Sequence, residues 1–591
     1  MRVFSRLLFS LFLVTNVTFA VAEEQSVAWT PWTPDIFQRA AQEHKFVLLD
    51  LGTQWCHWCH VMDVETYANP KVRKLLAEKY IAVRVDADAQ PDLGNRYEDY
   101  GWPATIVFND KGGEIVKRQG YLSPGEMSSM LQAIIDDPTP GPSVRAAKKI
   151  QYGDQNALGE SVRDELIKRH VSTYDLEKGA WGHGQKFLDW NNVEWSMRQA
   201  KRGDKAEEHM ATQTLAAQLN LLDPAWGGVY QYSTDDDWQH PHFEKIMQMQ
   251  TEDMRIYSLA FAQWHDPTYQ HTAEAIHHYL TRFLLDPNGG FYTSQDADLV
   301  DGVHSADYFA LTDAQRIARG IPRVDTHQYA RENGWAIRSL ACLFEYTGDR
   351  AALKEAEATA KWACDQRSIP GGGFRHDRTD AAGPFLGDTL AMGQAFLELY
   401  AVTADRGWLN RAEQAGDFIT AHFLRSNEAG IMTADVHVSR QFPPEQELDE
   451  NVDAARWANL LGQYSGRKQD QSLAKIAMRY LSTPAVALSQ RVAVAGVLLA
   501  NDEAATTALH IAVVGRKSEP GAAALFQIAG DFPTYYKRVE WYDASEGPLP
   551  NADVAYPNFG KPAAFVCTGA TCSRPALTVE DLSARLGRVI N

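Results

Sequence analysis

Residues 46–61 read Phe-Val-Leu-Leu-Asp-Leu-Gly-Thr-Gln-Trp-Cys-His-Trp-Cys-His-Val, and this stretch decides the fold of the N-terminal part of the chain. The apolar run 46–51 predicts a buried strand that ends at Gly52. The segment Cys56-His57-Trp58-Cys59 then opens a helix, where free N–H groups and the positive end of the helix dipole stabilise a thiolate. We therefore expect Cys56 to attack disulfides and Cys59, one turn later, to resolve the mixed disulfide.

Further residues around the two cysteines are predicted to support this chemistry. A protonated His57 would stabilise the Cys56 thiolate, and Asp50, a carboxylate inside the apolar strand, would accept a proton from Cys59. Pro103 directly precedes another predicted strand, and a cis-proline facing the dithiol would hold a partner chain in extended pairing. The aromatic residues predicted to contact this substrate are Trp55, Trp58 and Trp102.

Two other interpretations of the cysteine pair remain open. Cys56, Cys59 and His60 share a helix face and could hold zinc, although no fourth ligand is visible nearby. A purely structural disulfide is the other, but closing so short a loop restricts the unfolded chain little. The sequence therefore predicts neither a bound metal nor a cofactor.

Helix and strand patterns alternate on both sides of this motif. A helix is predicted over 35–44, and the further strands over 81–85, 104–108 and 115–118. Ser123-Pro124-Gly125-Glu126 is a capping box that opens a last helix, and a proline-rich stretch follows from Asp136. This order of elements predicts a thioredoxin-like α/β domain over 23–138 and a linker over 139–154.

The first 22 residues have the pattern of a secretory signal peptide. Arg2 and Arg6 precede a short apolar run, and Ala20-Val21-Ala22 offers a cleavage site of small residues. A membrane anchor is the alternative, but the run is too short to span a bilayer comfortably. We therefore expect an exported protein, periplasmic or secreted, cleaved near Ala22 and without stable membrane insertion.

The composition of the 591-residue chain narrows the classes of partner. Lys and Arg number 57 against 76 Asp and Glu, giving a net charge of −19. Because the chain is acidic and lacks a basic run, nucleic acid is not an expected partner. Six cysteines are too few for a disulfide scaffold in a chain of this length.

Helical patterns fill residues 155–500, and loops with glycine next to an aromatic or apolar residue recur between pairs of helices. Such repeated helical hairpins predict an all-α (α/α)6 toroid, followed by a small C-terminal α/β region over 501–591. Carboxylates and aromatics gather in two loops of the predicted rim and suit sugar chemistry. These candidates are Trp238, His242, Glu244, Asp296 and Asp298, which could equally hold the rim together by hydrogen bonds.

The four remaining cysteines lie two in the predicted toroid and two near the C-terminal end of the sequence. Cys342 and Cys364 lie on consecutive predicted helices at a spacing that keeps them apart, so we expect both to be unpaired. Cys567 and Cys572 flank a glycine turn and are expected to form a short disulfide. A second redox pair that exchanges with Cys56 and Cys59 is the alternative.

The order of motifs resembles one family, the thioredoxin-domain group that includes spermatogenesis-associated protein 20 and was once called domain of unknown function 255. The matching segments are 56–62, 101–103, 241–245, 289–292 with 296–298, and the tail residues Val566, Cys567, Cys572 and Pro575. The resemblance implies a thioredoxin-like domain joined to a toroid similar to those of N-acylglucosamine 2-epimerases and glycosidases. The chain departs from the family pattern at 301–309 and 451–456.

Three functions follow as hypotheses. The first is an exported thiol–disulfide oxidoreductase that acts on a protein thiol or disulfide, with the toroid binding that substrate or a redox partner. The second is a sugar-active toroid enzyme, epimerase- or glycosidase-like, with a carbohydrate ligand. The third is a binding scaffold whose dithiol senses redox state.

Overall fold

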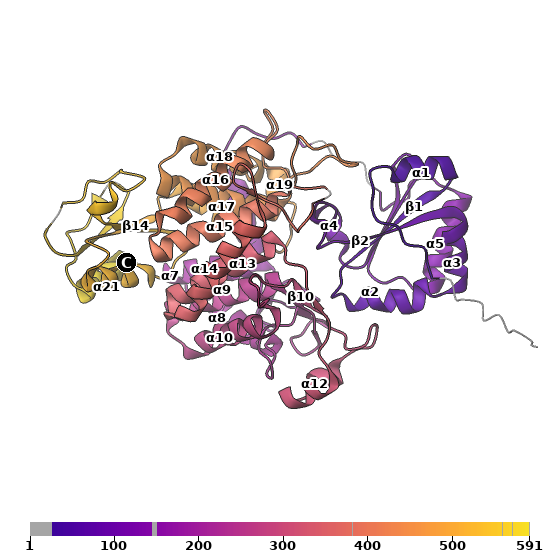
Figure 1. Cartoon of the computed structure of the whole chain (residues 1–591), viewed down its shortest axis with the longest axis horizontal. Coiled ribbons are helices and arrows are strands. Elements are labelled where there is room, and N and C mark those ends of the chain that lie inside the picture. Colours follow the sequence, from indigo (N-terminus) through magenta and orange to yellow (C-terminus); the bar gives the residue numbers. More distant parts are fainter. Residues whose placement is uncertain (1–25, 145–149, 381, 558, 570, 590–591) are drawn as a thin grey trace, which may run out of the picture.

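The computed structural model describes residues 26–144, 150–380, 382–557, 559–569 and 571–589. The predicted signal peptide, residues 1–22, lies outside these ranges. Three units follow one another along the long axis of the molecule: an α/β unit, a ring of helices and a second α/β unit (Figure 1). The predicted multidomain fold class is thus confirmed. None of the helices in the described ranges is both long and apolar enough to cross a membrane.

The N-terminal unit is a four-stranded sheet with the order β2-β1-β3-β4. The central strand β1 (Phe46–Gly52) pairs in parallel with β2 (Tyr80–Asp86) and antiparallel with β3 (Ala104–Phe108), which continues antiparallel to β4 (Glu114–Gln119). Because β1 and β3 are buried on both faces, both are apolar runs in the sequence. The helices are α1 (Ile36–Glu43), α2 (His57–Val61) continuing as a π-helix (Met62–Tyr67), α3 (Pro70–Lys79), α4 (Pro91–Tyr97) and α5 (Pro124–Asp136).

The middle unit is a closed ring of helical hairpins. Within the described ranges, six inner helices contact one another in cyclic order, and each carries an outer partner. The ring closes where α20, near its end, packs on α7, near its start. The inner helices are α7 (Trp190–Lys201), α9 (Met247–Trp264), α13 (Ala330–Thr347), α15 (Leu386–Thr403), α17 (Leu448–Ser465) and α20 (Ala495–Ala505). Their outer partners are α8 (Lys205–Gln218), α10 (Pro267–Tyr279), α14 (Arg350–Gln366), α16 (Arg406–His422), α18 (Lys468–Leu481) and α6 (Glu160–Ser172).

Short strands lie where the hairpins face the N-terminal unit. Three of them, β9 (Lys245–Ile246), β10 (Ser294–Gln295) and β11 (Val324–Asp325), form a sheet in the order β11-β10-β9, which we call the rim sheet. The glycine loops predicted between helices lead into such strands. The rim sheet brings three segments that are far apart in sequence to one edge of the ring.

The C-terminal unit repeats the strand topology of the N-terminal unit. Its order is β15-β14-β16-β17, with β14 (Leu509–Val514) parallel to β15 (Lys537–Tyr542) and antiparallel to β16 (Ala563–Thr568), which pairs with β17 (Thr571–Cys572). A helix α21 (Pro520–Gly530) follows β14, and α22 (Val579–Val589) ends the described chain. The expected small α/β region is therefore itself thioredoxin-like in topology, which the sequence did not reveal.

The two registers relate individual positions in the two α/β units. Leu51 lies opposite Ala104, and Val514 lies opposite Ala563. Counting onward from these pairs, Cys56, which caps α2, corresponds to Glu519, which caps α21. Cys59 corresponds to Ala522: a Cβ on Gly52 would lie 2.9 Å from the Cys59 sulfur, and one on Gly515 would lie 3.2 Å from the Ala522 methyl.

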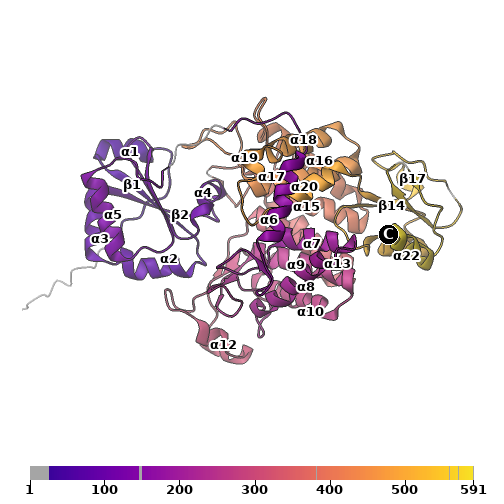
Figure 2. The same ribbon diagram turned by 180° about the vertical axis from the view of Figure 1, so that it is seen from behind.

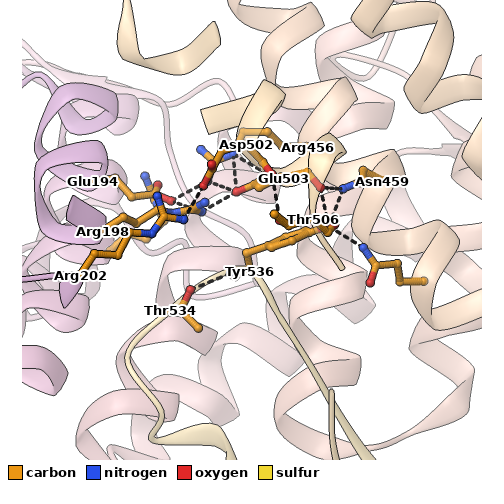
Figure 3. Close-up of polar contacts among 12 residues, drawn as sticks. Glu194, Arg198, Arg202, Arg456, Asn459, Asp502, Glu503, Thr506, Thr534 and Tyr536 are labelled. Carbon is orange, nitrogen blue, oxygen red and sulfur yellow. Dashed lines mark hydrogen bonds and ion pairs between the residues drawn. The ribbon is translucent and has the colours of Figure 1, made fainter. Parts of the chain in front are cut away.

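The C-terminal unit is fixed to the ring through Tyr536, which precedes β15. Its hydroxyl lies 2.6 Å from the Glu503 carbonyl oxygen, 2.7 Å from that of Thr506 and 2.8 Å from the Asn459 amide nitrogen (Figure 3). Beside it, the Glu503 carboxylate accepts hydrogen bonds from Arg456 and Arg198. These contacts join α17 and α20 to the last part of the chain.

Candidate redox site

The first turn of α2 holds the two predicted redox cysteines. Cys56 and Cys59 form a disulfide, and Cys56 is the N-cap of α2. The Cys56 sulfur accepts a hydrogen bond from the Cys59 N–H at 3.1 Å. Cys56 is buried, with 4% of its surface exposed. The helix end therefore supplies an N–H donor to the sulfur that would carry the thiolate after reduction.

Pro103 lies directly before a strand, at the position predicted for it. The Trp102–Pro103 peptide bond is cis, and Pro103 directly precedes β3, next to the central strand that leads to Cys56. Trp102 is half-buried against the apolar core of the N-terminal unit.

Asp50 is buried in β1 and has two partners that were not among the predicted site residues. Arg84, opposite it on β2, donates from Nε to Asp50 Oδ2 at 2.8 Å, and the Tyr67 hydroxyl donates to Oδ1 at 2.9 Å. Burial raises the pKa of Asp50, and the neighbouring Arg84 guanidinium opposes the rise. The predicted proton acceptor is therefore one member of an Asp50–Arg84–Tyr67 group in which Asp50 and Tyr67 are buried and Arg84 is half-buried.

Acidic residues that flank the rim sheet contact α2. His57 Nδ1 lies 2.7 Å from Asp298 Oδ1, and His60 Nδ1 lies 3.2 Å from Asp298 Oδ2. The backbone N–H of His57 donates to Glu244 Oε1 at 3.3 Å. Asp298 follows β10 and Glu244 precedes β9, so two separate hairpins of the ring reach the redox helix.

Arg323, just before β11, completes the contact between the two units. One of its Nη atoms lies 2.7 Å from the Gln54 carbonyl oxygen, 3.0 Å from His60 Nε2 and 3.0 Å from Asp296 Oδ2. The guanidinium thus joins the loop before Cys56 to the rim sheet. The guanidinium also places a positive charge between His60 and Asp296, which could otherwise share a cation.

The protonation of the rim acids follows from these contacts. Burial acts to raise the pKa of Asp298, but hydrogen bonds from His57 and His60 outweigh it and lower the value to about 2. Burial raises the pKa of Asp296 to about 6 against the attraction of His60. Burial opposes protonation of His60, yet its hydrogen bond to Asp298 and the charge of Asp296 raise its pKa.

The residues assigned to a sugar pocket have a different setting from the one expected. Glu244, Asp296 and Asp298 contact the redox helix or its Arg323 bridge rather than facing open space at the rim. Trp238 is buried, and its indole N–H donates to the Lys178 carbonyl at 2.7 Å. His242 is half-buried, stacks on Tyr232 and lies 3.8 Å from Glu244 Oε2. These contacts match the alternative that such groups hold the rim together by hydrogen bonds, and a carbohydrate site stays a prediction.

Two of the tryptophans predicted to contact a protein substrate differ in exposure. Trp58 is 41% exposed and packs beside Tyr121, so it can meet a partner. Trp55 is buried, and its indole N–H donates to Asp88 Oδ2 at 2.7 Å. Trp55 is therefore held by Asp88 of its own unit, and its contact with a substrate stays a prediction.

His60, Asp296 and Asp301 lie close enough to share a metal ion. Arg323 bonds both His60 and Asp296, and its fixed positive charge works against a cation there. Cys56 and Cys59 are joined to each other. The site therefore fits disulfide chemistry better than a zinc set built on His60.

The other cysteines divide into free and paired ones. Cys342, which is buried, and Cys364, which is partly buried, are free. Cys567 and Cys572 form a disulfide across the β16–β17 hairpin. This disulfide lies in the C-terminal unit, at the opposite end of the molecule from α2 (Figure 2).

The sequence reasoning missed Arg84, Tyr67 and Arg323. A signal existed for Arg84, because a charged residue interrupts the apolar run of β2 just as Asp50 interrupts β1. Arg323 lies in a loop and carried no such signal.

Comparison with known proteins agrees with this geometry. Residues 15–135 match the family model described as "Protein of unknown function, DUF255". The resemblance inferred from the sequence is confirmed. Mouse spermatogenesis-associated protein 20 is 29% identical over 307 residues, which are 46% of this chain and 39% of that protein. The alignment thus spans about two fifths of the length of that relative.

Two further similarities concern single units. "Thiol:disulfide interchange protein DsbD" of Colwellia psychrerythraea is 24% identical over 106 residues, 17% of each chain. The crystal structure of D-mannose isomerase covers 60% of this chain and 99% of its own, with a TM-score of 0.47 and 11% identity.

Proposed function

We propose that the protein is an exported thiol–disulfide oxidoreductase acting on protein thiols or disulfides. The observation that carries the proposal is the Cys56–Cys59 disulfide at the start of α2, with Cys56 as the N-cap of the helix. The name of the Colwellia relative, a thiol:disulfide interchange protein, supports the same chemistry.

The exchange proceeds by two sulfur transfers. A substrate thiolate attacks the Cys56 sulfur, the Cys56–Cys59 bond breaks, and Cys59 leaves as a thiolate that takes up a proton. A second substrate thiolate then attacks the substrate sulfur of the mixed disulfide and releases the Cys56 thiolate. The substrate is oxidised by two electrons, and the dithiol is reduced by two. The reverse sequence reduces a substrate disulfide, and a partner dithiol or disulfide regenerates the starting state.

The ring contributes polar side chains to the redox site, besides the role in binding a partner that was predicted for it. Asp298 bonds both histidines of α2, and Glu244 bonds the first N–H of the helix. Each contact changes the charge around the Cys56 sulfur. We propose that the ring adjusts the redox properties of the dithiol, a role that the N-terminal unit alone would lack.

Reduction of insulin disulfides and oxidation of reduced ribonuclease test the activity. The protein should catalyse at least one of them, and Cys56→Ser should abolish it. Equal rates for both proteins would refute the proposal. If neither reaction occurs but the disulfide responds to glutathione, the redox-sensing scaffold is the better description.

A further inference from the structure

A cavity of about 270 Å³ lies between the N-terminal unit and the ring. Its N-terminal side is formed by Trp55, which precedes Cys56, and by Asp88, Asn95 and Glu98. Its ring side is formed by the N-terminal ends of five inner helices, α7, α9, α13, α15 and α17. We call it the interface cavity. It is separate from the rim contacts of His57 and His60.

The walls of the interface cavity hold seven carboxyl groups and one cationic group. The cation is the guanidinium of Arg331, which is already paired with Glu332 Oε1 at 2.7 Å. When all seven carboxyl groups are ionised, the five helix ends, with about half a positive charge each, offset less than half of the remaining excess. The lining carboxylates are Asp88, Glu98, Glu332, Glu447, Asp449, Glu450 and Asp453.

Three buried acceptor atoms in the described walls have no hydrogen-bond partner, namely Glu332 Oε2, Gln394 Oε1 and Glu450 Oε2. Glu332 is 3% exposed, and its Oε2 is unpartnered. Gln394 is 7% exposed, and its Oε1 is unpartnered. A buried acceptor without a donor destabilises the fold, so an occupant that donates hydrogen bonds would be stabilised here.

Three tryptophans, Trp55, Trp190 and Trp335, complete the lining. Indole faces attract cations, and the Arg331 guanidinium already lies 4.9 Å from the ring centre of Trp335. Aromatic faces, excess carboxylates and unsatisfied acceptors together match a ligand that carries positive charge and N–H donors.

We propose that the interface cavity binds a small organic cation bearing ammonium or guanidinium groups. Its N–H groups would donate to Glu332 and Gln394, and its charge would offset that of the surrounding carboxylates. Because Trp55 and Asp88 form one wall and the ring forms the other, the occupant would contact both units at once.

Titration calorimetry of the full chain with putrescine tests the site, with glucose as a neutral probe and glucuronate as an anionic one. Putrescine should bind with a dissociation constant at least tenfold lower than that of either other probe. Glu332→Gln should weaken putrescine binding about tenfold or more, and Asp449→Asn, which lines the same cavity, should also weaken it. Glu177→Gln removes a charge from a side chain that is 85% exposed and should leave binding unchanged.

The pH dependence gives an independent check. Burial raises the pKa of Asp88 to about 7 and that of Glu450 to about 8. Putrescine binding should therefore weaken between pH 8.5 and pH 5.5, as Asp88 and Glu450 take up protons. The cationic groups that face the lining carboxyls are Arg331 and, beside Asp453, Arg338, Arg456 and Arg255. The proposal is overturned if glucose binds as tightly as putrescine, if putrescine does not bind, or if Glu332→Gln and Asp449→Asn both match Glu177→Gln.

Discussion

At the residue scale, the dithiol is surrounded by groups from both units. Cys56 has a helix N–H donor, but Glu244 takes the neighbouring N–H of His57 and brings a carboxylate to the same helix end. A negative charge there disfavours a thiolate, whereas the helix end favours one. The reduction potential reflects the balance of the two.

Glu244→Gln should make the disulfide a stronger oxidant. Loss of the carboxylate stabilises the Cys56 thiolate and hence the reduced form. A change of about one pKa unit corresponds to about 1.4 kcal/mol, or roughly 30 mV for a two-electron couple. Equilibration with glutathione measures the potential, and Asp301→Asn, which removes a nearby exposed charge, is the control. An unchanged or more negative potential would contradict the role assigned to Glu244.

Asp298→Asn should destabilise the protein most in mildly acidic solution. The pKa of Asp298 is lowered to about 2. Its contribution to the free energy of unfolding is therefore complete above its ordinary pKa of 3.8 and is lost as the pH falls through 2. The pKa of His60 is raised from 6.5, so its contribution is complete below 6.5 and is lost as the pH rises through the raised value.

The loss of unfolding free energy caused by Asp298→Asn should therefore be largest between about pH 4 and 6.5, at about 2 kcal/mol. Thermal unfolding of Asp298→Asn and the unmodified chain at pH 5.5 and pH 9 measures it. The difference in melting temperature should be greater at pH 5.5. Equal differences at the two pH values would show that the His57 and His60 pairs with Asp298 contribute no charge-dependent stability.

At the element scale, the sequence predicted the parts of the fold that rest on apolar periodicity. The four strands of the N-terminal unit and the paired helices of the ring each bury a recurring apolar pattern, which one sequence displays. The rim sheet could not be predicted, because strands of two residues have no periodicity. Its contacts with α2 depend on how Glu244, Asp298 and Arg323 are brought together by separate hairpins.

The topology of the C-terminal unit was hidden for a related reason. Its strand β14 is apolar like β1, but Glu519 and Ala522 stand at the positions that correspond to the two cysteines of the motif. Only the sheet order and register relate the two units.

The double substitution Glu519→Cys with Ala522→Cys should create a third disulfide beside Cys56–Cys59 and Cys567–Cys572. If α21 begins as α2 does, the two sulfurs will meet without backbone movement. Alkylation and mass spectrometry before and after dithiothreitol should show one added disulfide in this peptide. Glu519→Cys with Ala524→Cys, which places the second sulfur on another face of α21, should stay reduced. If both variants stay reduced, the proposed correspondence with α2 is wrong.

At the scale of the whole molecule, the ring holds the redox helix. Cys56 is buried while Arg323 joins the Gln54 loop to the rim sheet. Access of a large substrate to Cys56 therefore depends on how firmly the two units are joined. Trp58 remains exposed at the edge of this contact.

Arg323→Ala should speed the alkylation of reduced Cys56 by iodoacetamide several-fold. Loss of the guanidinium charge alone would raise the pKa of the thiol and slow the reaction, so a faster rate reports greater exposure. Arg319→Ala, at an exposed position on α12 (Asp313–Arg319), serves as the control. A slower or unchanged rate would show that Arg323 does not limit access.

The closure of the ring also sets an order of events during synthesis. The first α/β unit can fold as soon as residues up to α5 have emerged, because its sheet is local in sequence. The ring cannot close until α20 is available to pack on α7, and Tyr536 reaches α17 and α20 only later still. The redox unit is therefore complete while several hundred residues of its covering partner are still being made, and its cysteines are open to oxidants throughout that interval.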